Sequence, residues 1–121
     1  SSMTPTIVMK EDELFFTTGS PGGSRIISAV LQSILNIIDF EMDLEEANKS
    51  KRIHHQWQPD ILQIEFSLNN DMRQQLLNLN YKVKVIDPAT CLQTIMFKDG
   101  KYYGYGDFRR PDAFASGDIY D

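Results

Sequence analysis

The sequence predicts an α+β fold, because antiparallel hairpins and a strongly apolar helix occur in the same short chain. Residues 94–98 and 101–105 flank Asp99-Gly100, a dipeptide typical of a type I′ hairpin turn. Residues 26–38 carry Ile, Val and Leu at helical spacing, which is the strongest helix signal in the chain. Hairpins of this kind favour α+β over a doubly wound parallel sheet.

The first part of the chain predicts a second hairpin and the entrance to that helix. Residues 6–10 and 14–18 are rich in β-branched and aromatic residues, so each is expected to form a strand, with a polar turn at 11–13 between them. The glycine-rich segment 19–24 interrupts the strand pattern. Ser24, its last residue, is expected to cap the helix.

The second half adds short elements of both kinds. A helix from Asp43 to about Lys51 is expected, since Glu46 completes a capping-box pattern with Asp43. Asn69 or Asn70 is expected to cap a third helix. Alternating apolar and polar residues predict two further strands, at residues 61–66 and 81–85.

Composition limits the classes of function. A chain of 121 residues suits one domain, spanning 1–121, and its net charge of −5 argues against nucleic-acid binding and against a polybasic membrane contact. No apolar run approaches the length of a bilayer span, so we expect no membrane insertion. Cys91 is the single cysteine, which excludes an internal disulfide and a thiolate cluster. The abrupt start at Ser1 leads us to expect a segment of a larger protein.

The glycine-rich segment is the first candidate for chemistry. Gly22 and Gly23 lie between a predicted strand and a predicted helix, where backbone amides and the helix dipole can hold an anion or a developing oxyanion. A phosphate-binding P-loop would need Gly-Lys-Ser/Thr where this chain has Gly23-Ser24-Arg25. The alternative interpretation is a tight turn with no ligand, and these residues alone leave both open.

Other polar residues give weaker signals. His54 and His55 are expected to point to opposite faces of an extended segment, so packing or hydrogen bonding is favoured over metal binding. Cys91 is expected to be a buried thiol. Arg109 and Arg110 could clamp a carboxylate, although pairing with acidic groups of the fold is the simpler interpretation.

Four motifs taken together resemble the gamma-glutamyltransferases (gamma-glutamyl transpeptidases), and specifically the C-terminal part of their small subunit. In chain order they are residues 1–8 (Ser-Ser-Met-Thr-Pro-Thr-Ile-Val), 19–26 (Gly-Ser-Pro-Gly-Gly-Ser-Arg-Ile), 52–60 with its Arg-Ile-His-His-Gln-Trp, and 107–112 with its Arg-Arg-Pro-Asp. This family belongs to the N-terminal nucleophile hydrolases. The resemblance covers the chain from its first residue to its last.

The resemblance implies an incomplete part of an αββα sandwich from a self-cleaving precursor. A threonine nucleophile outside this chain would take the gamma-glutamyl group from glutathione or a related amide and pass it to water or an amine. By the same resemblance, Ser1 and Ser2 would bind the substrate alpha-carboxylate, and Gly22 and Gly23 would form the oxyanion hole. No cofactor or metal is implied.

The same family suggests partners and a location. The large subunit and the remainder of the small subunit would complete the site, so the chain alone is expected to be inactive. A periplasmic or secreted location is expected. Two departures from the family pattern affect local loops, namely Phe108 between Asp107 and Arg109, and the segment 87–92. The alternatives are a non-catalytic homologue or scaffold, and a relative acting on poly-gamma-glutamate or cephalosporin side chains.

Overall fold

The computed structural model describes residues 3–66 and 68–117. Its contacts divide the chain into two compact units. Unit 1 comprises Ser1–Ser50 and Thr90–Asp121, and unit 2 comprises Lys51–Ala89. The single domain expected for 1–121 stays a prediction.

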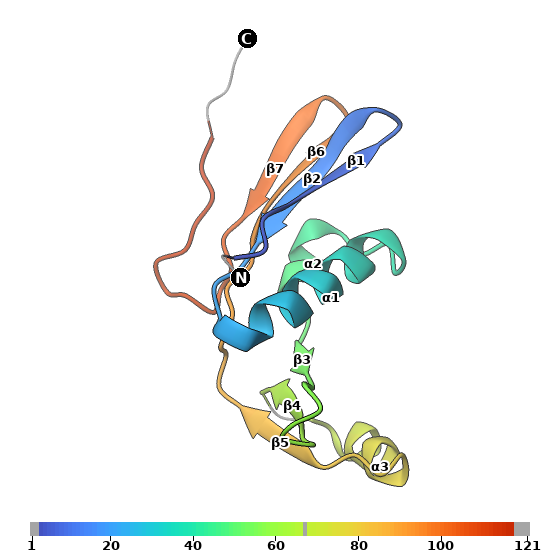
Figure 1. Cartoon of the computed structure of the whole chain (residues 1–121). Helices are drawn as coiled ribbons and strands as arrows, with labels where there is room; N and C mark the ends of the chain where they lie inside the picture. The colour runs from blue at the N-terminus through green and yellow to red at the C-terminus, as the bar shows by residue number, and fades with distance from the viewer. Residues whose placement is uncertain (1–2, 67, 118–121) are drawn as a thin grey trace. The chain divides into compact units, whose positions relative to one another are not determined.

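Unit 1 contains a four-stranded antiparallel sheet built from two hairpins (Figure 1). Its strands, in the order β1-β2-β6-β7, are Thr6–Lys10, Glu13–Gly19, Gln93–Lys98 and Lys101–Tyr105. Asp99 and Gly100 both have positive φ, 53° and 76°, which confirms the predicted type I′ turn. The first hairpin turns more tightly than expected, because Glu13 already pairs with Lys10.

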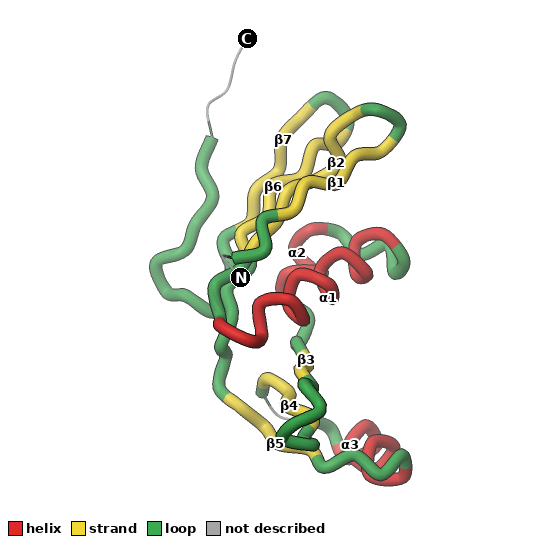
Figure 2. The backbone as a smooth tube through the Cα atoms, in the orientation of Figure 1, coloured by secondary structure: helices red, strands yellow, loops and turns green. Residues whose placement is uncertain are grey.

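Two helices cover one face of this sheet, α1 (Ile26–Ile38) and α2 (Leu44–Lys49) (Figure 2). The core between these layers contains buried Phe16, Ile37, Leu44, Ala47 and Met96. A second cluster joins the start of α1 to the chain entering β6, through Ile26, Val30 and Leu92. Side chains on the other face, such as Ile7 at 70% exposure and Ile95 at 50%, remain open. One helix layer on one sheet is half of the expected αββα arrangement.

The starts of the helices test the capping predictions. Asp43 caps α2, and its Oδ1 accepts a hydrogen bond of 2.8 Å from the Glu46 amide, as predicted. The prediction that Ser24 caps α1 is wrong. The chain already turns at Gly22, so Ser24 lies inside the 3-10 turn Gly23–Arg25, and Arg25 occupies the cap position without a side-chain bond.

Unit 2 has a three-stranded sheet in the order β3-β4-β5, formed by Ile53–His54, Leu62–Glu65 and Val83–Ile86. β4 and β5 are parallel, and α3 (Asn70–Asn78) connects them. The strands expected at 61–66 and 81–85 are confirmed with shifted ends. The residue pattern carries no expectation for how these two strands pair, and their parallel arrangement is possible because a helix connects them. None of the helices in the described part of the chain has the length and apolar character needed to cross a bilayer.

Candidate active site

The loop between β2 and α1 places two glycines in backbone conformations that other residues rarely adopt. Gly22 has φ 139° and ψ 18°, and Gly23 has φ 61°. The Gly22 carbonyl accepts a 3.2 Å bond from the Arg25 amide, which closes the first turn. A Cβ on Gly23 would meet nothing within 4 Å. The backbone conformation therefore favours glycine at Gly23, and the space beside this residue is open.

This loop is a tight turn that also has the chemistry of an anion site. Gly23–Arg25 is the first turn of a helical segment that continues through α1. Amides in a first helical turn lack intrahelical acceptors, and the helix dipole adds partial positive charge there. The arrangement can therefore stabilise a carboxylate or a developing oxyanion.

Ser20, two residues before Gly22, is completely buried and hydrogen-bonded through both its backbone and its side chain. Its amide donates to the Met3 carbonyl at 3.0 Å. Its hydroxyl donates to the Pro21 carbonyl at 2.7 Å and accepts from the Cys91 amide at 3.1 Å. Ser20 could not be singled out from the sequence, because a serine between two turn residues resembles ordinary loop composition.

The two serines expected to bind the substrate carboxylate, Ser1 and Ser2, lie outside the described residues. The chain is described from Met3, and the bond between the Ser20 amide and the Met3 carbonyl connects this segment to the glycine loop. The structure thus brings Met3, the residue that follows Ser2, into contact with Ser20, which lies two residues before Gly22.

A buried ion pair lies where the sequence departs from the family pattern. Asp107 Oδ1 accepts bonds of 3.1 Å from the Arg109 guanidinium and from the Arg109 amide, and Asp107 Oδ2 accepts one of 2.8 Å from the Leu92 amide. The guanidinium also donates to the carbonyls of Asn48 and Ser50, at 2.8 and 2.9 Å. Arg109 therefore pairs with an acidic group of the fold, whereas Arg110 is exposed.

The neighbouring histidines belong to unit 2 and bond in different directions. His54 Nε2 lies 2.9 Å from Gln56 Oε1, and His55 Nε2 lies 3.0 Å from Asp60 Oδ1. The hydrogen-bonded interpretation is confirmed. In the described residues, no group of three or more His, Cys, Asp or Glu side chains is arranged to hold a metal ion.

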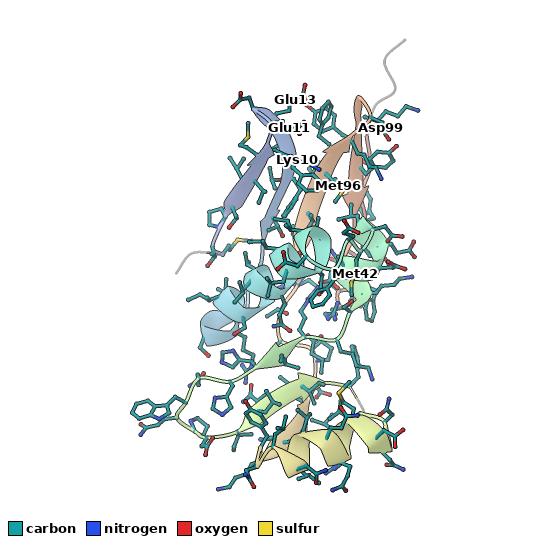
Figure 3. The ribbon with its side chains drawn as sticks, turned by 90° about the vertical axis from the view of Figure 1, so that its right-hand side faces the viewer. Lys10, Glu11, Glu13, Met42, Met96 and Asp99 are labelled. Atoms are coloured by element: carbon teal, nitrogen blue, oxygen red, sulfur yellow. The ribbon has the colours of Figure 1, made fainter. Side chains whose placement is uncertain are left out.

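A cleft of about 1280 Å³ lies elsewhere in unit 1. It opens between the two hairpin turns and the segment joining α1 to α2, with Glu11, Glu13 and Asp99 near the turns and Met42 and Met96 deeper (Figure 3). The glycine loop follows the opposite end of β2. This large hollow is therefore separate from the candidate anion site.

Comparison with known sequences identifies the family. The family model described as gamma-glutamyltranspeptidase matches residues 1–117. The chain is 42% identical over 118 residues to the glutathione hydrolase proenzyme of Escherichia coli, covering 97% of this chain and 20% of that protein. The proenzyme from Pseudomonas sp. is 38% identical, and 22% of its length is covered. The chain thus spans about a fifth of the curated relatives it matches.

Solved structures agree with the sequence comparison. The gamma-glutamyltranspeptidase T380A mutant of Helicobacter pylori superposes with a TM-score of 0.85 at 40% identity, covering 91% of this chain and 62% of that one. The Bacillus halodurans cephalosporin acylase, at 21% identity and a TM-score of 0.82, shares the fold. Because the family model matches residues 1–117, the chain belongs to the gamma-glutamyltranspeptidase family, and the relatives at 38–42% identity named above are enzymes.

Proposed function

We propose that this chain is the part of a gamma-glutamyltransferase that provides the oxyanion hole and the alpha-carboxylate contacts, with the nucleophilic threonine outside it. The observation that carries the proposal is the loop geometry at Gly22 and Gly23, two successive glycines with positive φ at the entrance of a helical segment. The family membership supports the choice of substrate class. The large subunit and the rest of the small subunit would complete the site.

In the proposed reaction, the threonine hydroxyl attacks the gamma-carbonyl carbon of glutathione or a related amide. The carbonyl oxygen becomes an oxyanion, and the amides of Gly22 and Gly23 donate hydrogen bonds to it. The proton of the threonine hydroxyl passes to the leaving nitrogen, and collapse of the intermediate breaks the carbon–nitrogen bond, which releases the amine and leaves a gamma-glutamyl ester. Water or an acceptor amine then attacks the ester and restores the threonine hydroxyl.

Ser1 and Ser2 have a separate role in this proposal. Two hydroxyl groups can donate to the alpha-carboxylate of the substrate, which holds the gamma-carbonyl at a fixed distance from the nucleophile. The chemistry requires no metal or cofactor, because the oxyanion is stabilised by backbone amides alone.

The decisive experiment compares two glycines with the same backbone constraint. Gly23 and Gly100 have φ 61° and 76°, and a Cβ at either would meet nothing within 4 Å. In the complete protein, Gly23→Ala and Gly100→Ala should each cost about 1–2 kcal/mol of stability through backbone strain. Only Gly23→Ala should lower turnover of a gamma-glutamyl anilide. Gly22→Val should lower kcat by about 10²- to 10³-fold, and near-normal turnover in a folded Gly22→Val protein would contradict the proposal.

Processing is the second test. Intact-mass measurement of the expressed full reading frame should give two chains, the smaller of which begins at a threonine upstream of Ser1. A single unprocessed chain that binds glutamate without hydrolysing a gamma-glutamyl anilide would establish a non-catalytic homologue instead. Faster turnover on poly-gamma-glutamate or on a cephalosporin side chain than on a gamma-glutamyl anilide would identify a different acyl donor and leave the proposed mechanism unchanged. We further propose a periplasmic or secreted location, which cell fractionation tests.

A further inference from the structure

The backbone around Met3 is held in an unfavourable conformation next to the glycine loop. Met3 and Thr4 have φ 62° and 43°, values that cost energy for residues other than glycine and most of all for a β-branched threonine. Two hydrogen bonds hold this turn, from the Ser20 amide to the Met3 carbonyl at 3.0 Å and from the Thr6 hydroxyl to the Thr4 carbonyl at 2.9 Å. Strained backbone of this kind persists where surrounding contacts fix it.

Ser20 also determines how the chain leaves the sheet. The β2–β6 ladder ends with the pair Gly19 and Gln93. Beyond this pair, the Ser20 hydroxyl takes the place of a backbone carbonyl, because it accepts the bond from the Cys91 amide at 3.1 Å. The main chain can therefore turn away from the sheet at Pro21, while Ser20 stays hydrogen-bonded to the chain entering β6. The second bond of the hydroxyl, to the Pro21 carbonyl at 2.7 Å, fixes the peptide that leads into Gly22.

Gly19 completes this junction by allowing close approach. A Cβ at Gly19 would lie 3.2 Å from the Met3 carbonyl oxygen and 3.7 Å from the Pro5 Cα. The chain at Met3 therefore packs directly against the end of β2. Any shift of this contact moves the segment that follows Ser2.

We propose that Ser20 is a positioning residue, whose hydroxyl fixes the glycine loop to the chain entering β6 and whose amide holds the turn at Met3 beside this loop. This inference rests on the proposed function for its catalytic consequence. The hydrogen bonds of Ser20 carry it, since they join the loop, the turn at Met3 and the chain entering β6.

The test uses Ser20→Ala in the complete protein and Thr18→Val as its matched control. Thr18 is buried in β2, two residues before Ser20, and its hydroxyl lies 2.9 Å from that of Thr94 on β6. Each variant therefore removes a buried hydroxyl bond between the chain near the end of β2 and the chain near the start of β6. Ser20→Ala should lower kcat for a gamma-glutamyl anilide by about 10- to 100-fold, with KM changed by less than about twofold. Thr18→Val should leave both constants within about twofold of the parent.

Hydrogen exchange gives a readout that is independent of turnover. Exchange of the Arg25 amide, which donates to the Gly22 carbonyl, and of the residue 20 amide, which donates to the Met3 carbonyl, should rise in Ser20→Ala and stay at the parent rate in Thr18→Val. Unchanged exchange in Ser20→Ala, unchanged kcat in that variant, or an equal loss of kcat in Thr18→Val would overturn the proposal. A parent protein without gamma-glutamyl turnover would contradict the proposed function, and the exchange comparison would still decide whether Ser20 holds the loop.

Gly19→Ala provides the opposite kinetic signature. Its methyl group would push the Met3 carbonyl by a few tenths of an ångström, because a separation of 3.2 Å between the new Cβ and that oxygen is tighter than ordinary packing. Because Met3 directly follows in sequence the two serines proposed to bind the carboxylate, this displacement should raise KM by about 3- to 10-fold and change kcat by less than about twofold. A loss confined to kcat would show that Gly19 does not affect the carboxylate contacts, and would overturn the proposed link between Met3 and the loop.

Discussion

The two units of this chain combine strands and helices in similar proportion but differ in what holds them together. Unit 1 buries a continuous set of apolar side chains between its sheet and its helices, centred on Phe16, Ile37 and Met96. In unit 2 the buried apolar residues are Leu62 and Ile64 of β4, and the buried Arg52, His54 and Glu65 are polar or charged. None of the residues of α3, all of which are described, is buried.

Unit 1 is stabilised by contacts between residues far apart in the chain, whereas α3 of unit 2 depends mainly on local interactions. In unit 1, side-chain bonds connect residues far apart in the chain, such as Ser20 with Cys91 and Arg109 with Asn48. In unit 2, α3 begins with a cap from its own neighbour, since Asn69 accepts from the Met72 amide. A helix of nine residues with little apolar burial is marginal in water. The catalytic candidates lie in the unit whose core can hold them rigidly.

The largest expected effect is that of Phe16→Ala in unit 1. Phe16 is fully buried in the main cluster, so truncation removes apolar contacts and leaves a cavity between sheet and helices. The complete protein should lose about 3–5 kcal/mol of unfolding free energy, measured by urea denaturation. Leu77→Ala in α3 is the control, because Leu77 is 48% exposed and should cost less than about 1 kcal/mol. Equal losses would contradict the contrast between the units.

Asp107→Asn should have the next largest effect. The carboxylate accepts bonds from the Leu92 amide on one oxygen and from Arg109 on the other. An asparagine amide turns one of these acceptors into a donor that faces another donor, and it leaves the buried guanidinium without its counter-charge. A loss of about 3 kcal/mol in unfolding free energy is expected. Arg110→Gln, at the exposed neighbouring arginine, should change stability by less than about 0.5 kcal/mol, and a similar loss there would contradict this account.

Features encoded in a few adjacent residues could be predicted from the sequence. The turn at Asp99-Gly100, the cap at Asp43 and the long helix in residues 26–38 all depend on local chemistry. The two-residue strand β3 and the parallel pairing of β5 could not, because both depend on a partner strand that local sequence does not reveal. The failed prediction of Ser24 as a cap has a local cause, the positive φ of Gly22 and Gly23.

The candidate site divides in the same way. Gly22 and Gly23 could be singled out because a glycine pair between a predicted strand and a predicted helix offers free amides at the helix entrance. Their positive φ values came only from the structure. Asp107 and Ser20 both lie in motifs visible in the sequence, but their structural roles could not be predicted, because each accepts a hydrogen bond from a main-chain amide distant in sequence, at Leu92 and at Cys91. A polar residue that satisfies a buried amide carries no periodic signal.

The smallest expected effect compares the two helix caps. Asp43 and Asn69 each accept a 2.8 Å bond from the amide three residues later, so removal of either side chain deletes the same local interaction, worth about 1 kcal/mol. The consequences should differ, because α2 places Leu44 and Ala47 in the core of unit 1, whereas α3 has no buried residue among its described positions. Asp43→Ala should lower the unfolding free energy of the whole protein. Asn69→Ala should raise hydrogen exchange in residues 70–78 and leave the global transition in place. A loss of unfolding free energy for the whole protein with Asn69→Ala would show that α3 is packed in the complete protein. The lack of buried residues in α3 would then be a property of the isolated segment.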